Sequence, residues 1–353
     1  MSLRKLIDRN IFISDFARRI SCYSYNKKIQ RFIEEISLVD SISDYSGFKK
    51  ILNRLPPQAF GSTYSIKRAY AENTLYGYAY NVMKYAGLEN EDILYFPLLE
   101  HGIDLSEEFY APRYVSGRNY IFQGNNKIDV WTKKLGQKGY AIGPFIHYSE
   151  SYYSDKQIEE IKRKNGKTLL VFLPHSDEYG GEDFLMDGFT KELFEIAKGY
   201  DSIIASVFWI DTTDKYVDYL QNQGVTLVSS GFKLDNNFVS RMKTIIQMAD
   251  TVVFPIMTTS IGYAYYLGKK VICLSSERNN ESINTEDQEF VSAENNRYVS
   301  KFCKIFNEKA DRKSKEADEL IDHYWGTSLI RNPDYIRNIY FTNKKEIKKK
   351  VGF

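Results

Sequence analysis

The chain has 353 residues, of which 27% are charged and 43% are hydrophobic, and this composition excludes a disordered protein. Because 48 Lys and Arg residues are balanced by 46 Asp and Glu residues, the net charge of +2 argues against nucleic acid as the main partner. The widely spaced Cys22, Cys273 and Cys303 exclude a disulfide framework and indicate a reducing compartment. No apolar run reaches the roughly 18 residues of a membrane span, and charged residues interrupt the N-terminus, so we expect a cytoplasmic protein.

Helical spacing of apolar residues predicts that most of the chain up to Pro57 is helical and that a second helical segment covers residues 66–85. Two prolines and Gly61 predict a loop over residues 53–65. The first helix carries Arg and Lys residues on its polar side. Either this helix packs on its own domain, as amphipathic helices usually do, or its basic face rests on a membrane.

Short apolar segments alternate with helical segments through the following residues, which is typical of parallel α/β architecture. In the first half we expect strands at 92–97, 119–124 and 139–143 and a helix at 127–135. In the second half we expect strands at 168–173, 202–209, 225–229, 251–255 and 270–274 and helices at 184–198, 215–223, 237–248 and 263–267. The sequence therefore predicts an α/β protein with two Rossmann-like parallel-sheet domains that face a cleft.

Ligands of open parallel sheets bind beyond the carboxyl ends of the strands, and this rule selects a short set of candidate residues. After the predicted strands come Glu100-His101, His175-Ser176, Ser230-Gly231 and Thr258-Thr259-Ser260. The near-neutral pKa of histidine suits His101 to the role of general base. Glu100 is its rival, since adjacent residues of an extended segment point in opposite directions and only one of them can face the cleft.

The hydroxyl-rich turn of Thr258, Thr259 and Ser260 follows a predicted strand and opens a predicted helix. Free N–H groups at a helix start attract phosphate, and the three hydroxyls would add hydrogen bonds. A helix N-cap is the alternative, although capping needs only one hydroxyl.

Several common motifs are missing from the sequence. Without GxGxxG, GxxxxGK[ST] or kinase signatures, a dehydrogenase or a P-loop NTPase is not expected. The scattered His and Cys residues predict no metal site, and the lack of GxSxG argues against a Ser nucleophile.

The segment from Ala249 to Ile272 resembles the donor site of GT-B glycosyltransferases, in which a strand and a hydroxyl-rich turn lead into a helix that ends at Gly-x-Pro-Val. Gly268-Lys269-Lys270-Val271 stands at that ending here, with Lys in place of Pro. The resemblance implies that Gly262 and Tyr263 also belong to the donor site. Many members have, at the position of Tyr263, a glutamate that binds the donor ribose.

Further segments resemble enzymes of bacterial capsule, O-antigen and teichoic-acid loci, in particular the CMP-sialic-acid and Kdo transferases and the polyol-phosphate transferases. Glu100-His101-Gly102 matches their His-Gly turn, Thr258-Thr259 their paired-hydroxyl turn, and residues 140–144 the strand that closes their first domain. Their His-Pro pair is missing, because Pro174-His175 has the reverse order.

This resemblance implies a metal-independent glycosyltransferase of capsule or lipopolysaccharide synthesis that uses no cofactor. Because Tyr263 replaces the ribose-binding glutamate, a CMP-linked acidic sugar is favoured over a UDP- or GDP-hexose as donor. Two alternatives stay open: a polyol-phosphate transferase on the same scaffold, and a non-catalytic GT-B-like binding protein.

On this interpretation residues 1–150 form an acceptor-side domain with a helical N-terminal extension, and residues 151–330 form the nucleotide-sugar-binding domain. Residues 331–353 form a helix and basic tail that return towards the first domain. Thr258, Thr259 and Ser260 would bind the donor phosphate, Ser230 and Gly231 would lie near its base or ribose, and His175 and Ser176 near its phosphate or sugar.

The acceptor would be a saccharide, often a lipid-linked one. The basic N-terminal face and the terminal cluster of Lys344, Lys345, Lys348, Lys349 and Lys350 therefore predict a weak contact with the inner face of the cell membrane. A solvated lysine tail is the alternative.

Overall fold

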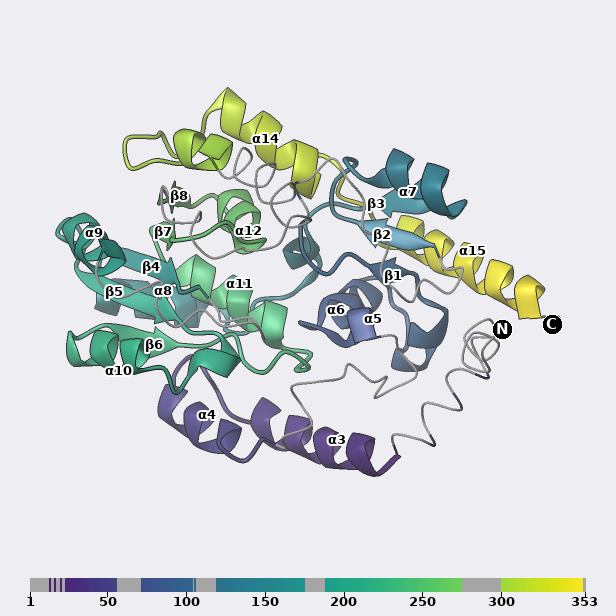
Figure 1. Cartoon of the computed structure of the whole chain (residues 1–353), viewed down its shortest axis with the longest axis horizontal. Helices are drawn as coiled ribbons and strands as arrows, with labels where there is room; N and C mark the ends of the chain where they lie inside the picture. The colour runs from purple at the N-terminus through teal and green to yellow at the C-terminus, as the bar shows by residue number, and fades with distance from the viewer. Residues whose placement is uncertain are drawn as a thin grey trace, which may run out of the picture.

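The computed structural model of the chain describes residues 23–55, 71–103, 105, 119–174, 188–274 and 300–351, and the single residues 13, 16 and 20. Two parallel sheets lie in neighbouring parts of the molecule, and helices surround both of them (Figure 1). The predicted α/β class with two parallel-sheet units is therefore confirmed.

The smaller sheet has three short parallel strands in the order β1-β2-β3. They are β1 (Leu98–Leu99), β2 (Tyr120–Phe122) and β3 (Gly139–Ala141). Helix α7 (Ile128–Leu135) connects β2 to β3 and places its fully buried Trp131 against the sheet. The indole lies 4.2 Å from the Tyr120 ring, measured between ring centroids, so the helix covers one face of this sheet.

The strand predicted over residues 92–97 is wrong in position, because Asn90–Tyr95 form a 3-10 helix, η2, and pairing begins only at Leu98. Pro97 has no N–H to give to a strand ladder, so pairing starts after it. The main-chain N–H of Asp92 instead donates to the carbonyl oxygen of Glu89 at 3.0 Å, which closes a local turn.

The larger sheet has five parallel strands in the order β6-β5-β4-β7-β8. Counted from β4, this is the 3-2-1-4-5 order of a doubly wound Rossmann sheet, whose direction of winding reverses between β4 and β7. Both of these central strands are buried almost throughout, which explains their apolar sequences. The strands are β4 (Thr168–Phe172), β5 (Ser202–Ser206), β6 (Thr226–Val228), β7 (Thr251–Phe254) and β8 (Lys270–Cys273).

Helices before and after these strands cover the larger sheet. Helix α8 begins with a capping box formed by Ser154 and Gln157, and α10 begins at Asp214, whose carboxylate accepts the N–H of Tyr216. The start of α10 agrees with the helix expected at 215–223. The helices are α8 (Asp155–Asn165), α9 (Gly188–Ala197), α10 (Lys215–Asn222), α11 (Phe238–Met248) and α12 (Ser260–Tyr266).

Two N-terminal helices, α3 (Tyr23–Ser37) and α4 (Tyr45–Leu52), pack on the larger-sheet unit. Their apolar residues share one buried cluster with Trp209 and Phe232, which follow β5 and β6. The sequence assigned these helices to the first domain as an extension, and the division of the chain at residues 150 and 151 stays a prediction.

Two further helices, α5 (Ala71–Thr74) and α6 (Tyr78–Tyr85), pack near the smaller sheet. They interrupt the single helical segment expected over residues 66–85. Tyr76, between them, has φ = +56°, and Gly77 has φ = +68°, so the chain breaks its helical path there.

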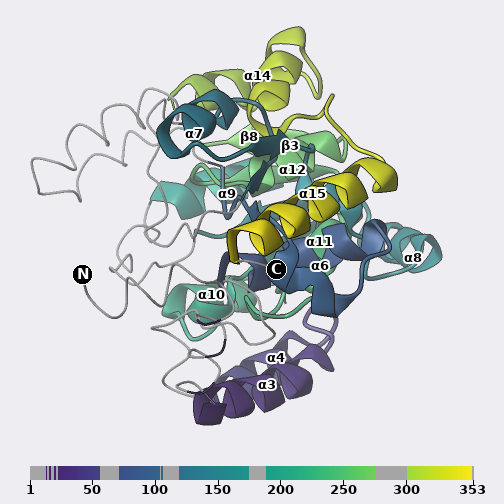
Figure 2. The ribbon, with the colours of Figure 1, turned by 90° about the vertical axis from the view of Figure 1, so that its right-hand side faces the viewer.

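The chain ends with α14 (Lys315–Trp325) and α15 (Pro333–Val351), and α15 lies beside the smaller sheet in both Figure 1 and Figure 2. Ile347 of α15 completes the apolar cluster around the strands of that sheet. The side-chain amide of Asn343 donates to the carbonyl oxygen of Tyr95 at 2.7 Å. Among the described residues, no helix combines the length and the apolar character needed to cross a bilayer.

Candidate functional site

A cavity of about 530 Å³ lies between the two units, at the carboxyl ends of strands from both sheets. This is the position at which open parallel sheets bind ligands. The smaller-sheet unit contributes the residues after β1 and the segment before α6, and the larger-sheet unit contributes the residues after β4, β5, β6 and β7. The cavity is lined by Tyr76, Tyr78, His101, Gly102, Ile103, Phe172, Leu173, Ser206, Val207, Phe208, Ser230, Phe238, Met242, Ile256, Met257, Thr258, Thr259 and Ser260.

His101 and Glu100 point in opposite directions, as an extended segment requires. The His101 side chain is exposed and lines the cavity, where its ring stacks on Tyr76 with centroids 5.1 Å apart. The Glu100 side chain is only 6% exposed, and its carboxylate accepts the main-chain N–H of Gln123 at 3.0 Å. Of the two candidate bases, His101 is thus the one that a ligand in the cavity can touch, while Glu100 joins the His101 loop to the neighbouring strand.

The three hydroxyls of the predicted phosphate turn have three different surroundings. Thr259 Oγ1 accepts the N–H of Ile103 at 3.1 Å, and Ser260 Oγ donates to Met242 Sδ at 3.6 Å. Thr258 Oγ1 is buried at the cavity wall and has no hydrogen-bond partner among the described residues. No side chain caps the start of α12, so the N-cap alternative does not describe this turn. Thr258 Oγ1 is thus the one of the three hydroxyls without a partner among the described residues, while Thr259 Oγ1 accepts a bond and still has its proton to donate.

Ser230 lines the cavity from the end of β6, whereas Gly231 is buried and is not part of the described wall. Gly231 has φ = +100°, and a Cβ built there would lie 2.7 Å from Nη1 of Arg241. The guanidinium of Arg241 is 1% exposed and pairs with the carboxylate of Asp235, with Nη1 2.5 Å from Oδ2. Gly231 therefore has a structural role, which is to let the chain pass a buried ion pair that supports the Ser230 wall.

Gly262 and Tyr263 do not lie in the cavity wall, which corrects the expectation that they contact a donor directly. A Cβ on Gly262 would lie 2.2 Å from the Trp325 indole, so this glycine allows α14 to approach α12. The Tyr263 side chain is fully buried, and burial, reinforced by the neighbouring Tyr78, raises its pKa far above the ordinary value. Both residues lie on the inner face of α12, which packs against the core.

His175 and Ser176 lie outside the described residues, so the structure does not place them. One cavity, by contrast, is lined by His101, Ser230 and the paired Thr258 and Thr259. His101 and Thr259 are more than 150 residues apart in the sequence.

The aromatic wall of the cavity was not predicted. Tyr76 packs against Phe238 with ring centroids 4.7 Å apart, and Phe208 lies 6.4 Å from Tyr76. Burial raises the pKa of Tyr76 to about 12, so its phenol stays neutral and keeps its proton at neutral pH. The signal that was available is the Tyr76-Gly77 pair, since a glycine inside a helical pattern often marks a break with a structural reason.

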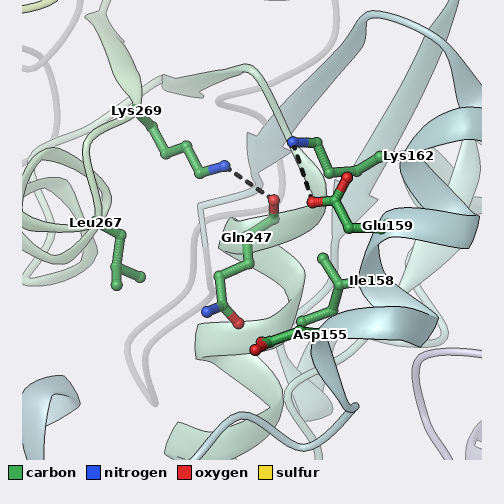
Figure 3. Close-up of a pocket in the computed structure, with 7 residues that line it drawn as sticks. All are labelled: Asp155, Ile158, Glu159, Lys162, Gln247, Leu267 and Lys269. Atoms are coloured by element: carbon green, nitrogen blue, oxygen red, sulfur yellow. Dashed lines mark hydrogen bonds and ion pairs between the residues drawn. The ribbon is translucent and has the colours of Figure 1, made fainter.

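A second, smaller cavity of about 250 Å³ lies at the amino ends of β7 and β8 (Figure 3). Lys269 donates from Nζ to the carbonyl oxygens of Gln247 at 2.8 Å and Ala249 at 2.6 Å. Burial, aided by the nearby Lys162, lowers the Lys269 pKa to about 8. Figure 3 also shows Glu159 paired with Lys162. This cavity is at the end of the sheet opposite to the usual ligand site, and it has no side chain from the smaller-sheet unit.

The two cavities differ in the charged residues of their walls. The smaller one is lined by two lysines and two acidic side chains, whereas the larger one, within the described residues, has no Lys, Arg, Asp or Glu in its wall. Among the described residues there is also no group of three His, Cys, Asp or Glu side chains that could hold a metal ion. The larger cavity is thus apolar and aromatic with a few neutral polar groups and one histidine, which is typical of small-molecule sites.

Comparisons with known proteins give distant similarities in structure. The wall teichoic acid polymerase TagF is similar over 71% of this chain and 67% of the TagF chain, with 10% identity and a TM-score of 0.39. The UDP-GlcNAc 2-epimerase from Neisseria meningitidis, solved with UDP-GlcNAc bound, is similar over 74% of this chain and 73% of its own, with 16% identity and a TM-score of 0.36. No protein-family model matches the sequence, and no curated protein matches it significantly. Similarities at this level identify neither the reaction nor the substrate of this chain.

Proposed function

We propose that the chain is a GT-B glycosyltransferase that moves a sugar from a nucleotide-activated donor to a growing or lipid-linked surface polysaccharide. The observation that carries this proposal is the shared cavity, in which His101 of the smaller-sheet unit and Thr258 of the larger-sheet unit line the same space. An inverting transfer needs a base for the acceptor hydroxyl and groups that hold the donor phosphate, and the two units supply such residues to one cavity.

In the proposed reaction, the acceptor hydroxyl attacks the anomeric carbon of the donor sugar. Its proton passes to a ring nitrogen of His101, and the bond from the anomeric carbon to the phosphate oxygen breaks, so that the nucleotide leaves with the electron pair. Tyr76 would position the His101 ring by stacking on it, and Gly102 gives the loop room beside Thr259.

The wall of the cavity bears on how the donor charge is distributed. A CMP-linked acidic sugar carries one charge on its phosphate and one on its carboxylate, whereas a UDP- or GDP-hexose carries both charges on its diphosphate. The described wall offers one hydroxyl-rich turn and no cationic side chain, which suits a single phosphate at that turn better than two adjacent ones. Thr258 Oγ1 would bond a phosphate oxygen, and Ser230 would lie near the ribose or base.

The first experiment tests the base. His101→Ala should lower turnover by roughly 10²–10⁴-fold, the usual contribution of a positioned general base. The affinity for the nucleotide should change little, since the donor residues lie on the other unit. His323→Ala is the matched control, because His323 is exposed on α14 and outside the cavity wall. Near-normal turnover in His101→Ala, with loss of turnover in Glu100→Gln, would make Glu100 the base instead.

The second experiment tests the donor. Thermal melting with CMP, CDP, UDP and GDP identifies the nucleotide, since a ligand that binds only the folded state raises the melting temperature. We expect CMP to give the largest shift and Thr258→Val to reduce it, whereas Thr258→Ser should keep it. Release of CMP with the phosphate retained in the product would identify a polyol-phosphate transferase, and no nucleotide shift at all would favour a binding protein.

We also expect transfer to continue in EDTA, and restoration of a lost activity by Mg²⁺ or Mn²⁺ would contradict the metal-independent reaction.

A weak membrane contact belongs to the same proposal. Ile13, Phe16, Ile20 and Tyr23 are each more than half exposed, and their spacing of three, four and three residues puts them on one helical face. An apolar face beside basic residues suits a helix that rests on an anionic bilayer.

The terminal lysines contribute less than the sequence suggested, because Lys344 is bound to Asp92 at 3.3 Å. Lys345, Lys348 and Lys349 are exposed. The chain should sediment with anionic vesicles at low salt and be released by salt, and Phe16→Ser should weaken the binding. A protein that stays in the supernatant at low salt would refute the contact.

A further inference from the structure

Two buried thiols meet at the end of β8. The Sγ atom of Cys273, the last residue of the strand, lies 3.1 Å from the Sγ atom of Cys303. Cys303 belongs to the helical residues 300–305, and the side chains of both cysteines are less than one tenth exposed. Neither is in a disulfide.

Main-chain and side-chain bonds hold the two thiols in this contact. The N–H of Cys273 donates to the carbonyl oxygen of Phe306 at 2.6 Å, which attaches the strand to the turn after the helical residues. The thiol of Cys303 donates to the carbonyl oxygen of Leu274 at 3.4 Å. Cys273 and Leu274 are therefore each bonded to the segment 303–306, and these two bonds keep the sulfur atoms of Cys273 and Cys303 next to each other in the folded protein.

We propose that Cys273 and Cys303 form a redox modification site, which closes to an intramolecular disulfide when the protein meets hydrogen peroxide or the disulfide of a small thiol. A disulfide has an S–S distance near 2.05 Å, so the sulfur atoms need to approach by only about 1 Å. With peroxide, the thiolate of Cys303 attacks one oxygen and hydroxide leaves, which gives a sulfenic acid. The Cys273 sulfur then attacks that sulfenic sulfur, the Cys273 proton is lost and water leaves. In total two thiols are oxidised and one peroxide is reduced to two water molecules. With a small disulfide, the Cys303 thiolate attacks one of its sulfur atoms and one small thiolate leaves. The Cys273 sulfur then attacks the Cys303 sulfur of the mixed disulfide, and the second small thiol leaves with the Cys273 proton.

We assign the first attack to Cys303, whose side chain is 7% exposed against 3% for Cys273. The hydrogen bond with Cys303, together with burial, raises the pKa of the Cys273 thiol far above its ordinary value, so the folded protein holds Cys273 as a neutral thiol. Both thiols stay reduced in a reducing compartment, and closure is slow compared with oxidation of an exposed thiolate.

Closure ties two points that are 30 residues apart in the sequence. The cross-link therefore removes freedom mainly from the unfolded chain, and it should raise the melting temperature by roughly 3–8 °C. The sulfur atoms are already in contact and neither lines the large cavity, so affinity for a nucleotide should not change.

Peptide mapping tests the proposal on the full chain. The protein is treated with hydrogen peroxide or a glutathione redox buffer, its free thiols are alkylated in denaturant, and it is digested with trypsin without reduction. Cleavage after Lys and Arg separates Cys22, Cys273 and Cys303 into residues 20–27, 271–278 and 302–304. We expect residues 271–278 joined to 302–304, and a rise in melting temperature that dithiothreitol reverses.

Variants assign the cross-link. Cys303→Ser and Cys273→Ala should lose both the joined peptide and the thermal shift, whereas Cys22→Ser should keep both. Oxidation of Cys22 in the wild type shows that the oxidant has acted on the protein. If peptides 271–278 and 302–304 are still recovered in alkylated form from that sample, the proposal is overturned. A joined peptide that contains residues 20–27 would overturn it as well.

Discussion

Among the ion pairs of the described residues, the one between Arg241 and Asp235 is where a single charge change should cost most. Both side chains are nearly fully buried, with exposed fractions of 1% and 2%, and Nη1 lies 2.5 Å from Oδ2. Nη2 also donates to the carbonyl oxygens of Ser37 at 3.1 Å and Val39 at 3.3 Å, at the end of α3. The pair therefore connects the N-terminal helices to the wall of the large cavity.

We expect Asp235→Asn to lower the free energy of unfolding by about 3–5 kcal/mol, because it leaves a buried guanidinium without a counter-charge. The carboxylate Oδ1 also accepts the N–H of Asn237 at 2.9 Å, and the amide oxygen of Asn can keep that bond, so the loss reports on the charge. Arg241→Met should lower the free energy of unfolding by a similar amount, since it leaves the carboxylate and two carbonyl oxygens without their hydrogen-bond donor.

The double variant separates the pair from its parts. With both charges gone, no buried ion is left unpaired, so the double variant should be at least about 2 kcal/mol more stable than the sum of the single losses predicts. The matched control is Glu150→Gln, which breaks an exposed pair with Lys84 at 2.6 Å. That exposed pair should contribute less than about 1 kcal/mol.

Urea unfolding at neutral pH, followed by circular dichroism and by tryptophan fluorescence, measures all four variants. The slope of free energy against urea should be unchanged, so that differences in midpoint report stability. The reasoning is refuted if Asp235→Asn costs no more than Glu150→Gln, or if the two single losses add to that of the double variant.

Three further changes have definite expected results. Gly262→Ala should cost about 1–3 kcal/mol in thermal melts, because its Cβ would lie 2.2 Å from Trp325, whereas Gly199→Ala, with nothing within 4 Å, should be neutral. Thr259→Val should leave a main-chain N–H of the smaller-sheet unit without its acceptor at a cost of about 1–3 kcal/mol, and faster hydrogen exchange of that amide checks it. Lys269 has a folded-state pKa lowered to about 8, so between pH 8 and its unfolded value of 10.5 the unfolded state binds more protons and the contribution of this residue to stability rises with pH. The stability difference between the wild type and Lys269→Met should change over that range, and a flat difference would contradict the shift.

Strands of the larger sheet were predictable because buried strands consist of consecutive apolar residues. β4 and β7 are covered on both faces, and this produces apolar runs that few other elements share. The start of α10 was predictable for a similar reason, as Asp214 caps that helix through a contact two residues away.

The prediction of a strand at 92–97 was wrong because the partners of this segment are distant in sequence. Asp92 accepts hydrogen bonds from Tyr340 and Lys344 of α15, about 250 residues further along the chain. No local pattern records such a contact, and four apolar or aromatic residues before a proline fit a strand and a 3-10 turn equally well.

The strand-end rule found His101, Ser230 and Thr258 because it depends only on topology. It could not find Tyr76 or Phe238, which reach the cavity from a helix break and a helix start. The resemblance of the 249–272 segment to a family motif led to the opposite error, because it placed Tyr263 at a ligand although this side chain faces the core.

The position of α15 has a consequence for synthesis on the ribosome. Ile347 completes the apolar cluster of the smaller sheet, yet about 200 residues separate it from β3, the last strand of that sheet. At roughly 5–20 residues per second, some 10–40 s pass between the emergence of the sheet and the arrival of the helix that covers it. The larger sheet is finished within that interval, so the nascent chain should protect its second half from proteases before its first half, in reverse of the order of translation.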